Sequence, residues 1–296
     1  MTGQIGSTVM IHPSAIISSQ AEIAPDAEIG PFCIVEAGTQ IGSGCRLVAN
    51  VSVRTGTVLG SESTVYEGAI LGGLPQIANQ PTNPGNLVIG KRNVLREHCT
   101  LHRAIHEGNS TTLGDDCLLM VGAHVAHDCQ VGNHVILTNG AMLGGHVEIG
   151  DRACLGGNSA VHQFCRIGRL VMVGACTKVV QDIPPFVLTD GATALIVGLN
   201  RVGLRRAGLS RQEILDLKAA YRLIYRHGLS FQETLQVLQE QFPTGVASEF
   251  ATFFQGGERG FVQERRSPPR IALRVHPAVD EIDEEESSPV PRRLAG

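Results

Sequence analysis

The sequence predicts a mainly β protein, built as a parallel β-helix of hexapeptide repeats followed by a small C-terminal α-helical domain. Three observations predict this class. An aliphatic residue recurs at almost every sixth position from Ile11 to Val179, glycine accounts for 35 of the 296 residues, and aromatic residues make up only 4%. A core with so few large rings has to be filled by aliphatic side chains inside a frame that is rich in turns.

The six-residue period is the strongest pattern in the chain. Of the 29 positions in this register, 27 are aliphatic, Ile77 among them. The two exceptions, Asn83 and Glu107, fall in segments rich in Pro, Asn, Gly and Ser, which we expect to leave the coil as loops. A period of six fits neither a helix nor an alternating strand. It fits short strands separated by turns, three to a coil of about 18 residues, and therefore about nine stacked coils.

The cysteines follow the same register. Six of the eight stand four residues after a register position, in a slot that elsewhere holds Ala, Ser or Thr: Cys33, Cys45, Cys99, Cys117, Cys129 and Cys165. A thiol in this slot packs inward as a small apolar group. Because the chain has no C-x-x-C pair, a disulfide, a zinc-thiolate site and a nucleophilic cysteine are all disfavoured.

The chain divides into four predicted segments. They are a flexible extension at residues 1–9, the β-helix at residues 10–189, the helical domain at residues 190–262 and a disordered acidic tail at residues 263–296. In the helical domain, capping boxes that start at Ser210 and Ser230 predict two helices, and a third is expected from Ser248 to Phe254. The tail is rich in Arg and Pro and then acidic, so it cannot bury a core.

Composition excludes several classes of function. The formal net charge of -4 argues against a nucleic-acid partner. No apolar stretch reaches the ~18 residues of a membrane span. The N-terminus has neither the basic region nor the apolar region of a signal peptide, so we expect a cytoplasmic protein.

Histidines gather at one place on the predicted coil. With about 18 residues to a coil, residues 18 apart in the chain stack on one another. His127, Gly145 and Gln163 therefore form a column; His146 and His162 are each one residue away from it, and His124 is three residues upstream of His127. Because these side chains do not occupy the inward register, they must project outward as a surface cluster.

Two kinds of chemistry could use this cluster, beside the alternative that the histidines are only solvated or packed against another subunit. A neutral His127 could act as a general base, oriented by the adjacent Asp128, while a backbone N–H such as that of Gly145 binds an oxyanion. Alternatively, three histidines could bind zinc. The H-x-x-H spacing of His124 and His127 is not a helical pair here, so the metalloprotease motif does not apply.

Several segments of the chain resemble those of a known family. GAHVAHDCQVGNHVILTNGAMLGGHVEIGD (122–151) and GGNSAVHQFCRIGRLVMVGACTKVVQDIPPFV (156–187) resemble the UDP-N-acetylglucosamine 3-O-acyltransferase family of hexapeptide-repeat acyltransferases. The likeness continues through GLNRVGLRRAGLSRQEI (198–214) and AYRLIYRHG (220–228), and so covers essentially residues 10–262. Hexads alone indicate only the superfamily, whereas A-H-x-A-H-D followed by G-H and V-H-Q-F is specific.

The resemblance implies a left-handed β-helix, a cytoplasmic homotrimer with sites between neighbouring prisms, and the first step of lipid A biosynthesis. The acyl donor would be a 3-hydroxyacyl chain on acyl carrier protein, the acceptor UDP-N-acetylglucosamine, with no cofactor and no metal. By the same likeness His127 matches the general base, Asp128 its partner and Gly145 the oxyanion amide. Substrate-binding positions would be Gln76, His124, His146, His162, Gln163, Asn200 and Arg206, and Ala175 would limit acyl-chain length.

Where this sequence departs from the family pattern, alternatives stay open. In the loop around Gln76, the Asp and Lys of the family are replaced by Ile77 and Asn79, which bears on the sugar that is bound. The second of two paired basic positions is Ala207. The alternatives are an N-acyltransferase on a UDP-amino sugar, a zinc enzyme of the carbonic anhydrase type, and a scaffold without catalytic activity.

Overall fold

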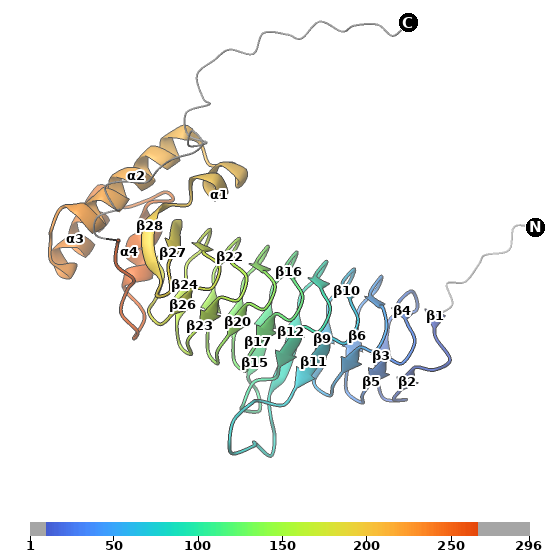
Figure 1. The fold of residues 1–296 in the computed structure, drawn as a ribbon. Helices are drawn as coiled ribbons and strands as arrows, with labels where there is room; N and C mark the ends of the chain where they lie inside the picture. Colours follow the sequence, from blue (N-terminus) through green and yellow to red (C-terminus); the bar gives the residue numbers. More distant parts are fainter. Residues whose placement is uncertain (1–9, 266–296) are drawn as a thin grey trace, which may run out of the picture. The chain divides into compact units, whose positions relative to one another are not determined.

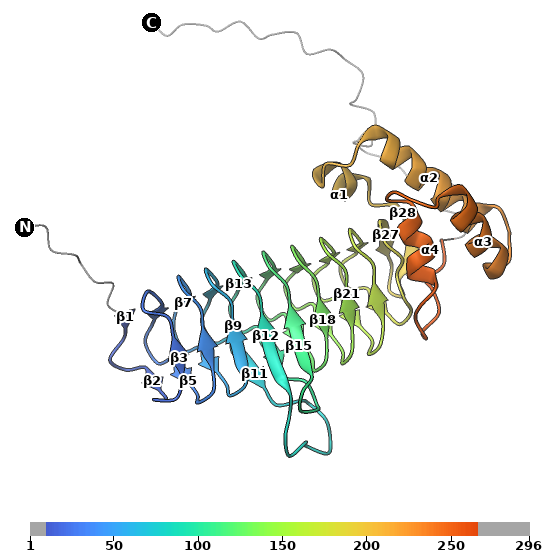
Figure 2. The same cartoon turned by 180° about the vertical axis from the view of Figure 1, so that it is seen from behind.

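The computed structural model describes residues 10–265. The predicted extension at residues 1–9 and residues 266–296 of the predicted tail lie outside the described residues. The predicted start of that tail at residue 263 was too early, because Glu264 is hydrogen-bonded to Tyr221 and Arg226. Within residues 10–264, the chain forms stacked coils whose strands build three sheets, one on each face of a prism. Four helices follow at one end of the coil (Figures 1 and 2). The predicted fold class is confirmed: a left-handed parallel β-helix is followed by a small helical part.

Each coil contributes one strand to each of three sheets, called A, B and C here. Sheet A contains β1 (Met10–Ile11), β4 (Glu28–Ile29), β7 (Arg46–Leu47), β10 (Thr64–Val65), β13 (Val94–Leu95), β16 (Leu118–Leu119), β19 (Ile136–Leu137), β22 (Cys154–Leu155), β25 (Met172–Val173), β27 (Val187–Asp190) and β28 (Leu195–Leu199). Sheet B contains β2 (Ile16–Ile17), β5 (Ile34–Val35), β8 (Ser52–Val53), β11 (Ile70–Gly73), β14 (Thr100–His102), β17 (His124–Val125), β20 (Met142–Leu143), β23 (Ala160–Val161) and β26 (Lys178–Val179). Sheet C contains β3 (Glu22–Ile23), β6 (Gln40–Ile41), β9 (Thr57–Leu59), β12 (Asn86–Ile89), β15 (Ser110–Leu113), β18 (Gln130–Val131), β21 (Glu148–Ile149) and β24 (Arg166–Ile167).

The second residue of a two-residue strand points into the prism and the first points out. Leu119, Leu137 and Leu155 are fully buried and pair in register across β16, β19 and β22. Successive coils therefore stack like residue on like residue, which is the packing that the six-residue period predicts. The six cysteines expected in the small inward slot are buried as free thiols, whereas Cys154 is half-buried and Cys176 is exposed.

The turns between strands require a left-handed backbone at their third residue, as a type II turn does. Glycine fills this position in some coils, but side chains occupy it in others. Asp128 and His146 have φ of 59°, and Phe164 has φ of 65°. An L residue in this conformation costs about 1–2 kcal/mol, so the packing of the neighbouring coils has to hold these residues in place.

Two excursions interrupt the regular coil. Residues 74–85 leave between β11 and β12, and residues 103–109 leave between β14 and β15. The predicted loops around Asn83 and Glu107 are thereby confirmed. Ile77, however, lies inside the first excursion and only half-buried, so the prediction that it is a core position was wrong. The excursion is twelve residues long, a multiple of six, so the register resumes in phase at Ile89 and the pattern does not reveal that Ile77 has left the coil.

The helical part confirms the three predicted helices and adds elements that the pattern did not predict. α2 (Arg211–Arg226) and α3 (Phe231–Gln241) begin with complete capping boxes at Ser210 and Ser230, and α4 (Ser248–Phe254) follows. The short α1 (Arg201–Arg206) and the antiparallel pair β27–β28 were not predicted. No helix within residues 10–265 is long and apolar enough to cross a membrane.

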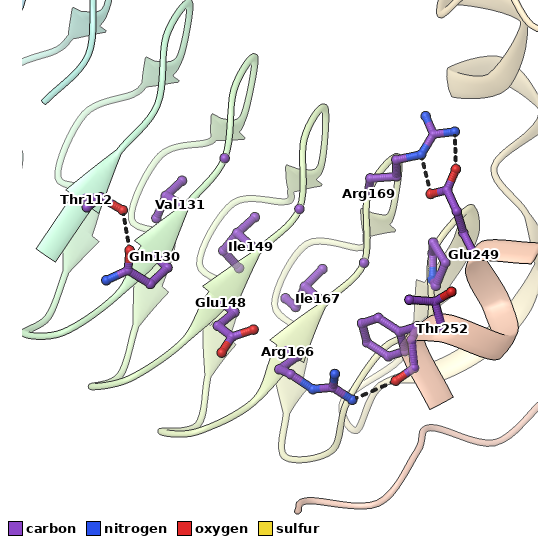
Figure 3. A pocket seen from close by; sticks show the side chains of 15 residues that line it. Thr112, Gln130, Val131, Glu148, Ile149, Arg166, Ile167, Arg169, Glu249 and Thr252 are labelled. Atoms are coloured by element: carbon purple, nitrogen blue, oxygen red, sulfur yellow. Dashed lines mark hydrogen bonds and ion pairs between the residues drawn. The ribbon is translucent and has the colours of Figure 1, made fainter. Parts of the chain in front are cut away.

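A groove of about 600 Å³ lies on the outer face of sheet C, next to α4 (Figure 3). Its two arginines are already paired, one with another residue of the groove and one with a buried partner. Arg169 forms two hydrogen bonds with Glu249, and Nε of Arg166 donates to the fully buried Asp182 over 2.8 Å. We therefore interpret this groove as the structural joint between coil and helices.

The inward register leads to a stability prediction on β12. Ile89 is 1% exposed, whereas its neighbour Val88 points outward and is 38% exposed. Ile89→Ala should lower the free energy of unfolding by about 2–5 kcal/mol because it leaves a cavity. Val88→Ala, the matched control, should cost less than about 1 kcal/mol. Urea unfolding at one fixed protein concentration measures both, and equal losses would contradict the register.

Candidate active site

The histidine cluster lies where sheets B and C meet, at what we call the B–C edge. Here a turn follows each sheet-B strand, and His127, Gly145 and Gln163 occupy equivalent places in the turns after β17, β20 and β23. His127 carbonyl accepts from the N–H of His146, and Gly145 carbonyl accepts from the N–H of Phe164. The predicted column is therefore present.

His127 and Asp128 form a hydrogen-bonded pair at the centre of the cluster. Nδ1 of His127 lies 3.0 Å from Oδ2 of Asp128, and the same oxygen accepts from the N–H of Ile105 over 3.0 Å. The N–H of Asp128 donates to Oγ1 of Thr111. An ionised carboxylate only accepts hydrogen bonds, so the proton of a neutral His127 sits on Nδ1. Nε2 is then left with a lone pair that can take a proton.

Gly145 has no side chain that would clash with the imidazole of His127, and its backbone N–H lies beside that ring as a hydrogen-bond donor. A Cβ built on Gly145 would overlap the ring of His127, so a larger residue cannot occupy this position without moving that ring. Gly145 is buried, and its N–H has no acceptor among residues 10–265. Buried backbone donors are almost always paired. This N–H is therefore free to donate to a ligand oxygen.

Two further predicted residues surround the pair. Nε2 of His146 lies 4.0 Å from Oδ2 of Asp128, and its ring stacks on Phe164 with a centroid distance of 4.6 Å. Nδ1 of His124 lies 2.8 Å from Oγ1 of Thr100. Burial, with a smaller effect from the neighbouring His102, lowers the pKa of His124 to about 4. His124 is therefore neutral near pH 7.

The predicted His162 and Gln163 lie two coils beyond His127 and are exposed. Nδ1 of His162 lies 3.0 Å from Nη2 of Arg259, which belongs to the segment after α4. The sequence pattern did not predict a role for Arg259. It lies outside the repeat and comes close to the B–C edge only when the helical part is folded.

Four predicted site residues do not join the cluster within one chain. Gln76 is exposed on the excursion at residues 74–85, which leaves from the same B–C edge. Ala175 is exposed in the turn between sheets A and B, and Arg206 is exposed on α1. Asn200 caps α1, accepting from the N–H of Gly203 and donating to the carbonyl of Leu170.

His102 belongs to the cluster and was missed. Its ring centroid lies 5.1 Å from that of His124, and burial lowers its pKa. The modulo-18 column could not find it, because the excursion at residues 103–109 lengthens this coil. β14 and β17 pair Thr100 with His124, a separation of 24 residues. If the extra length of this excursion is added to the 18-residue repeat, β14 aligns with β17 and His102 falls beside His124.

The cluster also contains groups that could bind a metal ion, and a cysteine lies beside it. Donor atoms of His127, Asp128 and His146 lie within 4.8 Å of one another, close enough to bind one ion. The hydrogen bond between His127 and Asp128 already explains their approach without a metal. Burial raises the pKa of the Cys129 thiol to about 12, so this neighbouring cysteine is not a nucleophile near pH 7.

Comparisons with known proteins agree on one family. The family profile described as UDP N-acetylglucosamine O-acyltransferase, domain 2, matches residues 182–262, and the bacterial transferase hexapeptide profile (six repeats) matches residues 110–145. The acyl-[acyl-carrier-protein]--UDP-N-acetylglucosamine O-acyltransferase of Paraburkholderia phymatum is 42% identical over 259 residues, which cover 86% of this chain and 99% of that relative.

Solved structures of similar proteins share the fold. The UDP-N-acetylglucosamine O-acyltransferase of Moraxella catarrhalis is 39% identical with a TM-score of 0.81, over 86% of this chain and 99% of that one. The UDP-N-acetylglucosamine acyltransferase of Francisella novicida is 30% identical with a TM-score of 0.85, over 91% and 100%. The resemblance inferred from the sequence is confirmed.

The buried, neutral His124 leads to a prediction for stability against pH. Its pKa of about 4 in the folded protein lies below the value of about 6.5 expected in the unfolded chain. As the pH falls from about 6.5 to about 4, the unfolded chain binds a proton that the folded protein does not, so stability should fall.

His124→Gln should flatten this decline in stability, measured as the urea unfolding midpoint at each pH. His134→Gln, at an exposed histidine of another edge, should leave the decline unchanged. Equal slopes in the two variants would contradict the assignment.

Proposed function

The chain belongs to the UDP-N-acetylglucosamine O-acyltransferase family, and from this premise we propose how its cluster performs the reaction. The activity is transfer of an acyl chain from acyl carrier protein to UDP-N-acetylglucosamine, the first step of lipid A biosynthesis. We propose a 3-hydroxyacyl chain as the donor group and the 3-hydroxyl of the sugar as the acceptor. The observation that supports this most is the His127–Asp128 hydrogen bond beside the unpaired, buried N–H of Gly145.

In the proposed mechanism Nε2 of His127 removes the proton from the sugar 3-hydroxyl, and the oxygen attacks the thioester carbonyl. A C–O bond forms, and the negative charge moves to the former carbonyl oxygen. The N–H of Gly145 binds this oxyanion. When the intermediate collapses, the C–S bond breaks and the imidazolium returns its proton to the thiolate of the carrier. Asp128 stabilises the imidazolium between the two steps, as a carboxylate does in other histidine-based sites.

We assign the surrounding residues to substrate binding. His124, His146, His162 and Gln163 line the edge on either side of the proposed base. The exposed Gln76 and Arg206 and the half-buried Asn200 are proposed contacts for the sugar nucleotide. The amide of Asn200 already caps α1, so its contribution to a nucleotide requires a shared or exchanged hydrogen bond.

We propose a homotrimer with the site between neighbouring prisms. From β13 to β25 the outward residues of sheet A are apolar and half-buried, as at Leu118, Ile136 and Met172, whereas Gln130 and Glu148 project from sheet C. A contiguous apolar face of this kind is typical of a protein–protein interface. In addition, the proposed base and Ala175 lie on different edges of one prism. For both to act on one acyl chain, a second prism has to place the edge that bears its Ala175 beside the base of the first.

The proposed compartment is the cytoplasm, which suits a protein whose cysteines are all free. An N-acyltransferase on a UDP-amino sugar stays the main alternative, since the loop around Gln76 departs from the family pattern. A zinc enzyme on the same prism requires stoichiometric metal, and a scaffold requires no turnover at all. An acyl-transfer assay with both acceptors, combined with a metal determination, separates the four.

His127→Ala tests the proposed base. It should lower acyl transfer to UDP-N-acetylglucosamine by about 10²-fold or more, because proton removal from the hydroxyl is lost. Thermal unfolding should stay close to that of the unaltered protein. His134→Ala, which removes an exposed histidine of another edge, should keep full activity. Near-normal turnover by the His127 variant would rule out the general-base assignment.

Ala175→Gly tests the chain-length proposal. With a panel of 3-hydroxyacyl carrier proteins and mass detection of the product, the unaltered protein should add one hydroxyacyl group to the sugar nucleotide. Removing the Ala175 methyl should move the optimum to a longer chain and change the kcat/KM ratio of neighbouring lengths by about tenfold or more. Ala24→Gly, in a turn of the first coils, is the control and should leave the optimum unchanged. An unaltered optimum in the Ala175 variant would contradict the proposal.

A further inference from the structure

The excursion at residues 74–85 is held at both ends by two consecutive residues. Nδ1 of His102 lies 2.7 Å from the carbonyl oxygen of Leu74, where the excursion departs. Arg103 donates from Nε to the carbonyl of Gly85 over 2.6 Å and from Nη2 to the carbonyl of Pro84 over 2.8 Å, where it returns. A carbonyl only accepts, so the proton of a neutral His102 lies on Nδ1.

The slot for His102 permits little movement. The residue is 9% exposed, its ring packs against that of His124, and a Cβ on Gly73 would lie only 2.9 Å from the ring. A histidine whose single ring proton goes to Leu74 is thus confined between the first excursion and the active-site cluster.

Arg103 is a half-buried cation whose guanidinium donates its hydrogen bonds to the main-chain oxygens of Gly85 and Pro84 rather than to a carboxylate. Burial lowers the pKa of its guanidinium, and the negative charge of Glu36 opposes this effect only in part. Burying a charge is costly unless it is well hydrogen-bonded. The hydrogen bonds to Pro84 and Gly85 therefore stabilise the half-buried charge of Arg103 as well as the end of the excursion.

The same short segment reaches the proposed catalytic pair. Ile105, two residues after Arg103, donates its N–H to Oδ2 of Asp128, the oxygen that accepts from His127. Within residues 102–105, the chain thus contacts both ends of the excursion and the carboxylate of the pair. The excursion, this segment and the turn at His127 all lie at the B–C edge on successive coils.

We propose that His102 and Arg103 are positioning residues for the acceptor: they clamp the excursion at residues 74–85 so that Gln76 receives the sugar nucleotide in a fixed relation to the His127–Asp128 pair. The proposal rests on the proposed function for the identity of the acceptor. A twelve-residue excursion without these contacts would have to be ordered when the acceptor binds, at a cost in conformational entropy. The clamp removes much of this cost beforehand.

Two variants test the clamp in the full-length protein. His102→Leu removes the donor to Leu74, and Arg103→Met removes the donors to Pro84 and Gly85 while keeping a long side chain. Each should raise amide hydrogen exchange in residues 74–85 and raise KM for UDP-N-acetylglucosamine about tenfold, as the loss of one buried hydrogen bond does. KM for the acyl carrier protein should stay close to normal, which a general loss of fold would not allow.

Conservative variants and distant controls sharpen the test. His102→Gln and Arg103→Lys keep a donor and should recover part of the acceptor affinity, and they keep the test decisive where a leucine or methionine variant fails to fold. His134→Leu and Arg92→Met remove a histidine and an arginine from another edge, where Arg92 pairs with Asp116, and should change neither readout.

Each outcome decides one part of the proposal. An excursion that stays equally protected in both clamp variants overturns the clamp, whatever the acceptor is. Raised exchange with unchanged acceptor KM overturns the positioning role. If the unaltered protein transfers no acyl group to UDP-N-acetylglucosamine, the proposed function fails, and raised exchange in the variants still supports the clamp as a device for holding residues 74–85.

Discussion

The stacking of one inward aliphatic side chain per six residues is the constraint on which the rest of the structure depends. Strands of two residues are too short to be stable alone. They persist because each is paired in register with the coils before and after it, and because residues such as Leu119 and Leu137 bury their side chains completely against one another. Every outward side chain is thereby fixed in height and direction by the coil that bears it.

The chemistry of the cluster follows from this rigidity. Asp128 and His146 adopt a left-handed backbone in equivalent turns of successive coils, so their side chains meet at one edge. A flexible loop would not hold Gly145 so close to the ring of His127 that no Cβ fits between them. The prism thus acts as a preorganised frame, in which the proposed base, its carboxylate and the oxyanion donor need no rearrangement.

Periodic parts of the molecule could be predicted, and irregular parts could not. Residues 18 apart stack in a regular coil, so simple arithmetic placed His127, Gly145 and Gln163 in a column. The same arithmetic missed His102, because an excursion of the backbone separates its coil from that of His124. It also counted Ile77 as core, since the excursion has a length divisible by six and therefore leaves the register in phase on both sides. Capping boxes located two helices, whereas α1 has no comparable sequence signature.

The fold class, the inward register, the buried thiols and the clustering of the histidines could all be predicted from the sequence, because each follows from a repeat along the coil axis. Which irregular segments return to the B–C edge became clear only in the folded chain. Residues 102–105 reach both the excursion at residues 74–85 and Asp128 through main-chain groups, and Arg259 reaches His162 from beyond the last helix. Such contacts depend on where the backbone departs from the repeat, and a periodic pattern does not contain this information.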